Sequence, residues 1–291
     1  MPGRMMENSD VFPRPPGATP GAAAEGGLGA GAASPSAAPP RSVSRRTLLL
    51  GGLGAVVAVG VPTALAVLSE SAPESVVLAG HTDSIYSVAF SPDGATLATG
   101  GNDTVRLWDV ADREVITART HDIDWVHSMA FSPDGATLAS VNRNTVRLWD
   151  VTGRETVTPL TTLTGYTGYT GHVRSVAFSP DGTILAVGGD DRTAKLRDVT
   201  DRENVVTLAT LTGHTGGVTE VAFSPDGKTL ATSSLDDTVR LWDVAGRETI
   251  ATLTGHTGSV GSVAFSPDGT TLATGGGEND YTVRLWPGLK D

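Results

Sequence analysis

Phe90-Ser91-Pro92-Asp93-Gly94 is a five-residue sequence that occurs five times in this chain of 291 residues. The other copies begin at Phe131, Phe178, Phe223 and Phe265, at spacings of 41, 47, 45 and 42 residues. Because Pro fixes the backbone angle φ and Gly tolerates positive φ, this sequence is typical of a tight turn. Self-similarity at such a period indicates an architecture built from repeated supersecondary units.

Short strand-forming segments surround each turn. In the first unit, residues 85–90 are β-rich and mostly apolar, and residues 96–99 follow the turn. A polar turn at 102–103 leads to a third strand at 104–108, and a fourth is expected at 114–117. The Asp-Gly pair is interpreted as part of the turn, since it lacks further ligands at the spacing of a calcium loop. Four short strands in every unit predict an all-β fold.

A Gly-His pair precedes most units, and a Trp-Asp pair lies near the end of most of them. At a period of 41–47 residues this pattern resembles the WD-repeat family over about residues 75–286. In that family each repeat builds a four-stranded blade, and the blades pack radially around a channel. The resemblance implies a five-bladed β-propeller with units at about 75–119, 120–163, 164–211, 212–253 and 254–286.

The two ends of the repeat region match each other. Val76-Val77-Leu78 precedes Gly80-His81 as the segment 250–253 precedes Gly255-His256, whereas the last unit stops after its third strand, at Trp286. Val76–Leu78 is therefore predicted to supply the fourth strand of the fifth blade and to close the ring, which would remove an exposed sheet edge. Self-association and descent from a longer parent are the alternatives.

The resemblance also implies that His, Ser or Thr, Asp and Trp form a hydrogen-bonded set that ties each blade together. Asn102 or Asp103 has the acidic role in the first unit, and Arg143 replaces the Asp in the second. The side chains assigned to this structural role are His81, Thr99, Trp108, His121, Ser140, Trp149, Asp191, His214, Thr232, Asp236, Trp242, His256, Thr274, Asp280 and Trp286.

The third unit departs most from the family pattern. Tyr166 or Tyr169 replaces the His, and Val187 replaces the hydroxyl. Arg197 stands where Trp is expected, and a duplicated Gly-Tyr-Thr shifts His172 towards the first strand. We expect this blade to be the least rigid.

Sets of His, Asp and Ser can resemble catalytic triads, but here they recur from unit to unit, whereas catalysis needs one cleft with a uniquely perturbed pKa. Five of the six histidines lie at or near Gly-His positions, which leaves His127 as the spare one. No Gly-x-Ser-x-Gly sequence occurs, and no His pair has metal-ligand spacing. We therefore expect no catalytic residue, no metal and no cofactor.

Partners of this family bind around one mouth of the channel, at the start of each first strand and beside the structural Asp. The larger residues at these positions gather in the first three units. Aromatic and Arg side chains usually dominate interfaces. The hypothesis is a site for a peptide or protein loop formed by Tyr86, Trp125, His127, His172 and Arg174. The alternative is that Trp125 packs on a neighbouring blade and the other side chains are solvated surface.

Charge argues against a nucleic-acid partner. The formal net charge is −11, and residues 67–291 carry 16 basic and 29 acidic side chains, a balance of −13 that repels phosphate backbones. There is no cysteine, which excludes disulfides and thiolate metal sites.

The N-terminal part has a different composition. Residues 1–43 form an Ala/Gly/Pro-rich leader that is predicted to be disordered. Residues 44–69 begin with Ser44-Arg45-Arg46-Thr47-Leu48-Leu49, which resembles a twin-arginine export signal, and 64–66 would suit a signal peptidase. The other interpretation is a transmembrane helix, since residues 48–68 would span about 31 Å. A buried core helix is disfavoured, because three Arg precede this long uncharged segment. Either main interpretation places the repeats outside the cytoplasm.

The sequence thus favours a non-catalytic protein-interaction scaffold on the outer side of a bacterial membrane, secreted or anchored through residues 48–68. One alternative is the sensor or ligand-binding module of a membrane signalling protein, because the linker and the hydrophobic segment resemble the join between a cytoplasmic kinase and an outer propeller. A propeller hydrolase is less favoured, since Asp190 is the one carboxylate at the mouth positions beside the structural Asp.

Overall fold

The computed structural model describes residues 75–119, 125–153, 156–166 and 171–289. All helical or extended secondary structure in these residues consists of β-strands, so the predicted all-β fold is confirmed. Nothing in this part of the chain forms a helix that could cross a membrane. The predicted leader at 1–43 and the hydrophobic segment at 44–69 lie outside the described residues.

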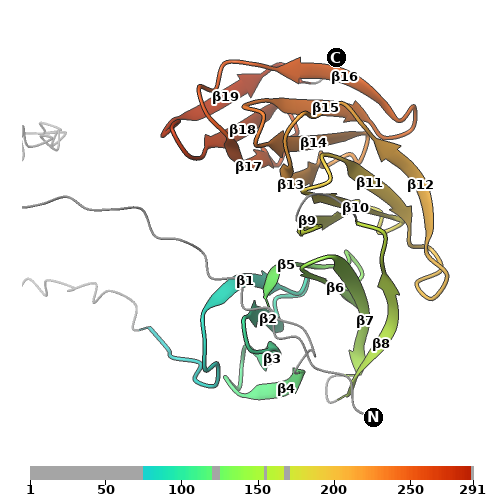
Figure 1. The fold of residues 1–291 in the computed structure, drawn as a ribbon. Helices are drawn as coiled ribbons and strands as arrows, with labels where there is room; N and C mark the ends of the chain where they lie inside the picture. Colours follow the sequence, from blue (N-terminus) through green and yellow to red (C-terminus); the bar gives the residue numbers. More distant parts are fainter. Residues whose placement is uncertain (1–74, 120–124, 154–155, 167–170, 290–291) are drawn as a thin grey trace, which may run out of the picture. The chain divides into compact units, whose positions relative to one another are not determined.

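Nineteen strands of the described chain form five antiparallel sheets, which follow one another from cyan to red in Figure 1. Each strand pairs with the next along the chain. Sheet 1 contains β1 (Ile85–Phe90), β2 (Thr96–Gly101), β3 (Val105–Asp109) and β4 (Val115–Arg119), and sheet 2 contains β5 (Val126–Phe131), β6 (Thr137–Asn142), β7 (Thr145–Gly153) and β8 (Thr156–Leu163). Sheet 3 contains β9 (Val173–Phe178), β10 (Ile184–Gly189), β11 (Ala194–Asp198) and β12 (Val206–Leu211), and sheet 4 contains β13 (Val218–Phe223), β14 (Thr229–Ser234), β15 (Val239–Asp243) and β16 (Glu248–Leu253). Sheet 5 contains β17 (Val260–Phe265), β18 (Thr271–Gly276) and β19 (Val283–Pro287).

The repeated five-residue sequence forms the turn between the first and second strands of every sheet. Its glycine has positive φ in all five copies, between +70° and +73°. In sheet 4, Ser224 Oγ donates to Asp226 Oδ1 at 2.6 Å and accepts from Thr229 N at 3.0 Å. Asp226 Oδ1 also accepts from Lys228 N at 3.1 Å. The Asp carboxylate therefore holds its own turn.

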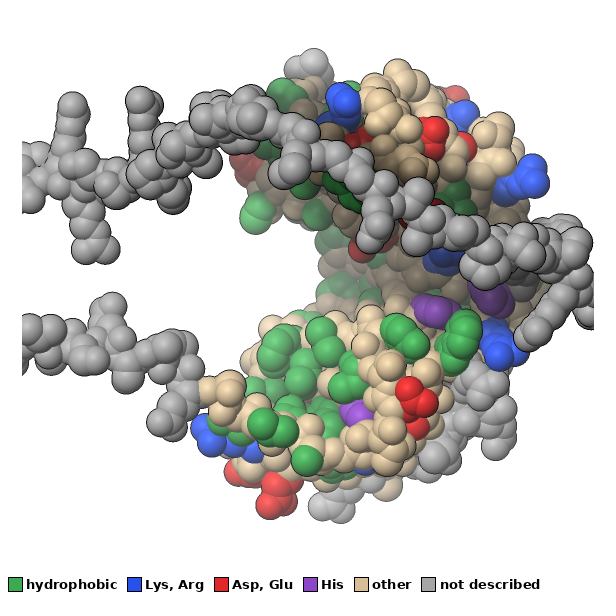
Figure 2. Space-filling view, turned by 60° about the vertical axis from the view of Figure 1, so that its left-hand side comes forward, with side chains coloured by type: hydrophobic (Ala, Val, Ile, Leu, Met, Phe, Trp, Pro, Cys, Tyr) green, Lys and Arg blue, Asp and Glu red, His purple; other side chains and the backbone are tan. Residues whose placement is uncertain are grey.

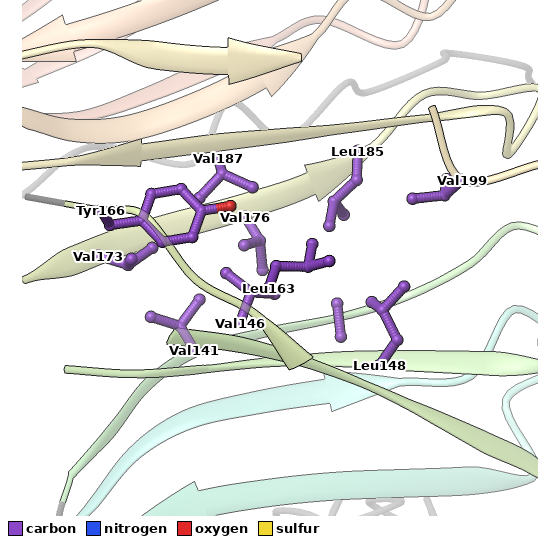
Figure 3. Packing of buried hydrophobic residues seen from close by; sticks show 11 residues of the cluster. Val141, Val146, Leu148, Leu163, Tyr166, Val173, Val176, Leu185, Val187 and Val199 are labelled. Carbon is purple, nitrogen blue, oxygen red and sulfur yellow. The ribbon is translucent and has the colours of Figure 1, made fainter. Parts of the chain in front are cut away.

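Neighbouring sheets pack through their first strands, since β1 lies against β5, β5 against β9, β9 against β13, and β13 against β17. The apolar core lies between consecutive sheets. Between sheets 2 and 3, Val146 and Leu148 of β7 face Val173 and Val176 of β9 (Figure 3). All four of these side chains are buried. This packing explains why alternate residues of the first and third strands are apolar: they fill the space between two sheets.

The structure differs from the prediction that Val76–Leu78 closes a ring of blades. Residues 75–84 form no strand, and sheet 5 has three strands in the described chain, with β19 at its edge. Sheets 1 and 5 share no interface like those between consecutive sheets. The physical reason is that each interface is filled by equivalent side chains at equivalent positions, so the packing sets the rotation from one sheet to the next. Five such steps need not return to the starting sheet.

Candidate functional site: a pocket at the starts of the first strands

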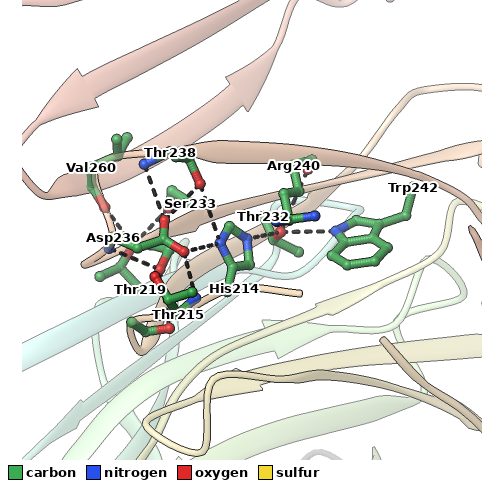
Figure 4. A network of polar contacts seen from close by, with 12 residues as sticks. His214, Thr215, Thr219, Thr232, Ser233, Asp236, Thr238, Arg240, Trp242 and Val260 are labelled. Atoms are coloured by element: carbon green, nitrogen blue, oxygen red, sulfur yellow. Dashed lines mark hydrogen bonds and ion pairs between the residues drawn. The ribbon is translucent and has the colours of Figure 1, made fainter. Parts of the chain in front are cut away.

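The hydrogen-bonded set in sheet 4 shows what most of the polar side chains that recur from repeat to repeat do (Figure 4). His214 Nδ1 lies 2.9 Å from Asp236 Oδ2, and its Nε2 lies 2.8 Å from Thr232 Oγ1. Trp242 Nε1 donates to the same hydroxyl at 2.9 Å. Burial lowers the pKa of His214, which keeps the ring neutral. A neutral ring can donate from Nδ1 to the carboxylate and accept from the hydroxyl at Nε2.

The carboxylate of Asp236 is held in its charged form. Burial would raise its pKa, but hydrogen bonds from Thr238, from the backbone N of Thr215 and from His214 outweigh that effect and lower the pKa to about 2. Such a buried and fully bonded network is a structural element, because each polar group already has its partner inside the blade.

Sheets 1 and 5 repeat this geometry. Asp103, rather than Asn102, has the acidic role in sheet 1, where its Oδ1 lies 2.8 Å from His81 Nδ1. Thr99 receives the Trp108 N–H at 2.8 Å, and Thr274 receives the Trp286 N–H at 2.9 Å. In sheet 5, His256 Nδ1 lies 2.7 Å from Asp280 Oδ2. In sheet 2, Trp149 donates to Ser140 at 2.9 Å, and His121 lies outside the described residues.

Sheet 3 fills the same space differently. Val187 is buried at the hydroxyl position, and Tyr166 is buried in the core between sheets 2 and 3. The Tyr166 ring lies 4.9 Å from Lys195 Nζ and 5.3 Å from Arg197 Cζ. Asp191 pairs with Lys195 instead of a histidine. Tyr169 lies outside the described residues. The lower rigidity expected of this blade stays a prediction.

A pocket of about 490 Å³ lies at the starts of β5, β9, β13 and β17. Its walls come from four different repeats. They are Trp125, His127, His172, Val173, Arg174, Thr219 and Gly261. Four of the five residues proposed from the sequence as a binding site line it. The fifth, Tyr86, lies beside it, since its ring centroid is 5.9 Å from that of His127.

The aromatic rings of the pocket form a continuous group. Trp125 meets His127 edge-on, with ring centroids 5.9 Å apart, and His127 lies 6.5 Å from His172. Trp125 is 42% exposed and has φ of +68°, a left-handed conformation that is rare for a bulky residue. The ring contacts of Trp125 with His127 and Arg143 lie within its own repeat. Backbone strain of this kind costs about 1–3 kcal/mol and clusters at functional sites.

The charges of the pocket favour a neutral His127. Burial lowers the pKa of His127, and its electrostatic interactions with His172 and Arg174 lower it further, although Asp190 acts in the opposite direction. Arg174 forms an ion pair with Asp190 at the end of β10, and its side chain is still partly exposed. The pocket therefore offers an indole, a neutral imidazole and an oriented guanidinium.

Three residues at the pocket were outside the sequence hypothesis. Thr219 and Gly261 stand at the aligned positions of the fourth and fifth units, where they looked too small to contribute. Their small size is what leaves the space open, since a Cβ on Gly261 would meet nothing closer than 3.8 Å. The third residue is Arg143, whose Cζ lies 5.7 Å from the centroid of the Trp125 ring. Its occurrence in place of the expected Asp was the available signal.

Comparison with known families agrees with this architecture. A family model described as the IFT122 first beta-propeller matches residues 54–249, about two thirds of the chain. A second model, described as the WD domain, G-beta repeat, matches residues 247–287. The chain belongs to the WD-repeat β-propeller family.

Curated relatives match over single repeats. A WD repeat-containing protein of Synechocystis is 49% identical over 41 residues, which are 13% of this chain and 12% of the relative. A Notchless protein homolog of Arabidopsis thaliana is 54% identical over 37 residues, which are 12% of this chain and 8% of the relative. The chain thus aligns with about a tenth of the length of these relatives.

Proposed function

We propose that this protein is a non-catalytic scaffold that binds a peptide segment or protein loop in the pocket at the starts of the first strands. WD-repeat propellers are in general protein-interaction scaffolds. The observation that carries the proposal is the convergence of Trp125, His127, His172 and Arg174 from two repeats on one pocket.

The side chains of the pocket suit a peptide. Trp and Arg are the residues that most often dominate binding energies, above all where a rigid ring lies beside a pocket. Trp125 is held between Arg143 and His127, so little of its freedom would be lost on binding. Arg174, oriented by Asp190, can donate to a backbone carbonyl or to a carboxylate.

A scaffold fits these groups better than an enzyme does. Thr219 is the hydroxyl-bearing residue among the described pocket residues, and its Oγ1 lies 2.5 Å from the Val260 carbonyl and 2.8 Å from Ser233 Oγ. Those contacts direct it into the fold. The Asp190 carboxylate is paired with Arg174. Neither group is placed as an activated nucleophile with a base beside it.

We further propose that the repeats act on the outer side of a bacterial membrane, either after twin-arginine export or anchored through residues 48–68. The support is the sequence from Ser44 to Leu49 and the uncharged segment behind it. Intact mass of the protein from membrane and medium fractions of a bacterial host tests this. A released species that begins near Val67 indicates cleavage, a full-length membrane species indicates an anchor, and full-length protein in the cytosol contradicts both.

The binding proposal is tested by selecting peptides from a displayed library against the full chain and then measuring their affinity by calorimetry. The Trp125→Ala, Arg174→Ala double variant should weaken binding at least tenfold, since each truncated interface anchor typically costs about 1–2 kcal/mol or more. The control is a Val206→Ala, Arg113→Ala double variant, which removes an exposed apolar side chain and an exposed Arg outside the pocket. Unchanged affinity in the pocket variant would remove the proposal.

A further inference from the structure

The first sheet has an apolar face that no other sheet of the described chain covers. Val88 of β1 is 65% exposed, whereas its counterparts Met129, Val176, Val221 and Val263 are between 4% and 7% exposed. Ile85 and Phe90 of the same strand are exposed as well. We call Ile85, Val88 and Phe90 the β1 face. Figure 2 shows a group of hydrophobic side chains on the lower part of the described surface, where sheet 1 lies.

The fifth sheet has the opposite uncovered face. Val283 and Leu285 of β19 are 75% and 67% exposed. The leucines equivalent to Leu285, at the same position of β3, β7, β11 and β15, are at most 4% exposed. We call Val283 and Leu285 the β19 face. Exposed apolar groups of this kind, on positions that are otherwise core, indicate an interaction surface.

These two faces are the two halves of one interface that the molecule already forms four times. Between sheets 4 and 5, Val239 and Leu241 of β15 pack against Val260 and Val263 of β17. Val283 and Leu285 are the repeat equivalents of the first pair. Ile85 and Val88 are the equivalents of the second pair. A β19 face placed on a β1 face would therefore reproduce an interface whose side chains fit.

The missing fourth strand of sheet 5 gives a second, independent indication. In sheet 4 the fourth strand, β16, is separated by one residue from the Gly255-His256 pair that begins the next repeat. Val76–Leu78 stands in the same place before Gly80-His81, but it forms no strand and joins none of the sheets of the described chain. If a sheet 1 were docked on sheet 5, its Val76–Leu78 would arrive beside the open edge of β19. An open strand edge of this kind is a template for strand addition.

We propose that the β19 face of one copy binds the β1 face of a second copy, whose Val76–Leu78 adds the fourth strand to sheet 5. A second copy is the occupant because the chain supplies both halves of the interface, in matching register, while its own halves do not meet in this structure. The contact is heterologous, since it joins two different surfaces. It therefore extends until the rotation between copies closes a ring.

Light scattering of the full chain across a wide concentration range, with the mass of each species measured after chromatography, tests this proposal. The wild type is expected to assemble beyond the monomer. Val88→Asp and Leu285→Asp should each yield monomers, because a charge cannot be buried in an apolar interface without a partner. Val206→Asp, which places the same charge on the exposed first residue of β12, should assemble like the wild type.

A mixture of the two interface variants gives the decisive result. The Val88→Asp copy keeps a β19 face and the Leu285→Asp copy keeps a β1 face, so together they can form one intact contact and no second one. The mixture should contain pairs and nothing larger, which also shows that both variants are folded. A monomeric wild type at every concentration, assembly that persists in Leu285→Asp, or a mixture without pairs would each overturn the proposal.

Discussion

Sheets 3 and 4 have the same strand order and nearly the same register, yet equivalent positions carry a polar network in sheet 4 and an apolar side chain in sheet 3. In sheet 4 the Thr232 hydroxyl, opposite Arg240, joins His214 to Trp242. In sheet 3 the equivalent position is Val187, opposite Lys195. The two sheets keep the same shape because each packs against its neighbours through buried apolar side chains. The polar network therefore adds to a fold that the apolar packing already specifies.

The difference between the two sheets also explains where the pocket comes from. His214 stands nine residues before Phe223, whereas His172 stands six residues before Phe178. The shift takes His172 out of the buried network and places its ring in the pocket beside His127. Sheet 3 thus lacks a histidine in the structural network and has one at the pocket instead.

Replacing these two histidines should separate the two roles, and it should have the largest effect. His214→Ala leaves the Asp236 carboxylate and the Thr232 hydroxyl buried without their partner, which should cost about 2–4 kcal/mol of unfolding free energy. His172→Ala removes a half-buried pocket side chain that is absent from any such network, and it should change stability by less than about 0.5 kcal/mol.

Urea unfolding followed by tryptophan fluorescence and by circular dichroism measures both variants. Agreement of the two probes checks that a single unfolding free energy is meaningful. The peptide affinity of the pocket should respond in the reverse order, with the loss confined to His172→Ala. Equal destabilisation by the two substitutions would contradict the division of roles.

The sequence was sufficient for the sheets because the repeated turns and the alternating apolar positions are local signals. The first strand was predicted at 85–90, where β1 lies, and the third at 104–108 against β3 at Val105–Asp109. The alignment of repeats also brought Trp125, His127, His172 and Arg174 together, since equivalent positions in a repeat protein lie on the same side.

Closure was beyond the sequence, because it depends on a rotation summed over several interfaces rather than on any local pattern. The fate of Tyr166 was equally hard to foresee. It was considered as a substitute for the structural histidine, whereas it fills the core between sheets 2 and 3 under two cationic side chains. Whether a large ring can fill this core depends on the side chains of the neighbouring sheet. The sequence of a single repeat does not show them.

The Asp236→Asn substitution tests, through the pH dependence of stability, how much the polar network contributes to sheet 4. Asp236 has a pKa lowered to about 2 from the ordinary value of 3.8, so its stabilising effect is complete above about pH 4 and is lost as the pH falls towards 2. The lowered pKa of His214 acts in the same direction from about pH 6.5 downward. The variant should lose about 1–2 kcal/mol at pH 7 and little more between pH 4 and pH 2.

Melting temperatures of the two proteins at a series of pH values check this expectation. Carboxylates outside this network titrate alike in both proteins, so the difference between the wild type and the variant reports on Asp236 together with its hydrogen-bond partner His214. The two curves should converge at the acid end. Parallel curves over the whole range would mean that the Asp236 carboxylate contributes no more to sheet 4 than a neutral amide does.

The last prediction concerns the turn that sheets 3 and 4 have in common, where the two sheets should not differ. Gly182 and Gly227 end the repeated turns at φ of +73° and +72°, and an added Cβ would lie 3.4 Å and 3.3 Å from a Pro Cδ of the preceding turn. A side chain in this conformation costs about 1–2 kcal/mol. Gly182→Ala and Gly227→Ala should therefore destabilise the protein by equal amounts, whereas Gly261→Ala, without positive φ and with its added Cβ at ordinary van der Waals distance from its neighbours, should not destabilise it. If Gly182→Ala lowered the unfolding free energy clearly more than Gly227→Ala, sheet 3 would tolerate backbone strain in its turn less well than sheet 4 does. The apolar packing between sheets would then not by itself explain their common geometry.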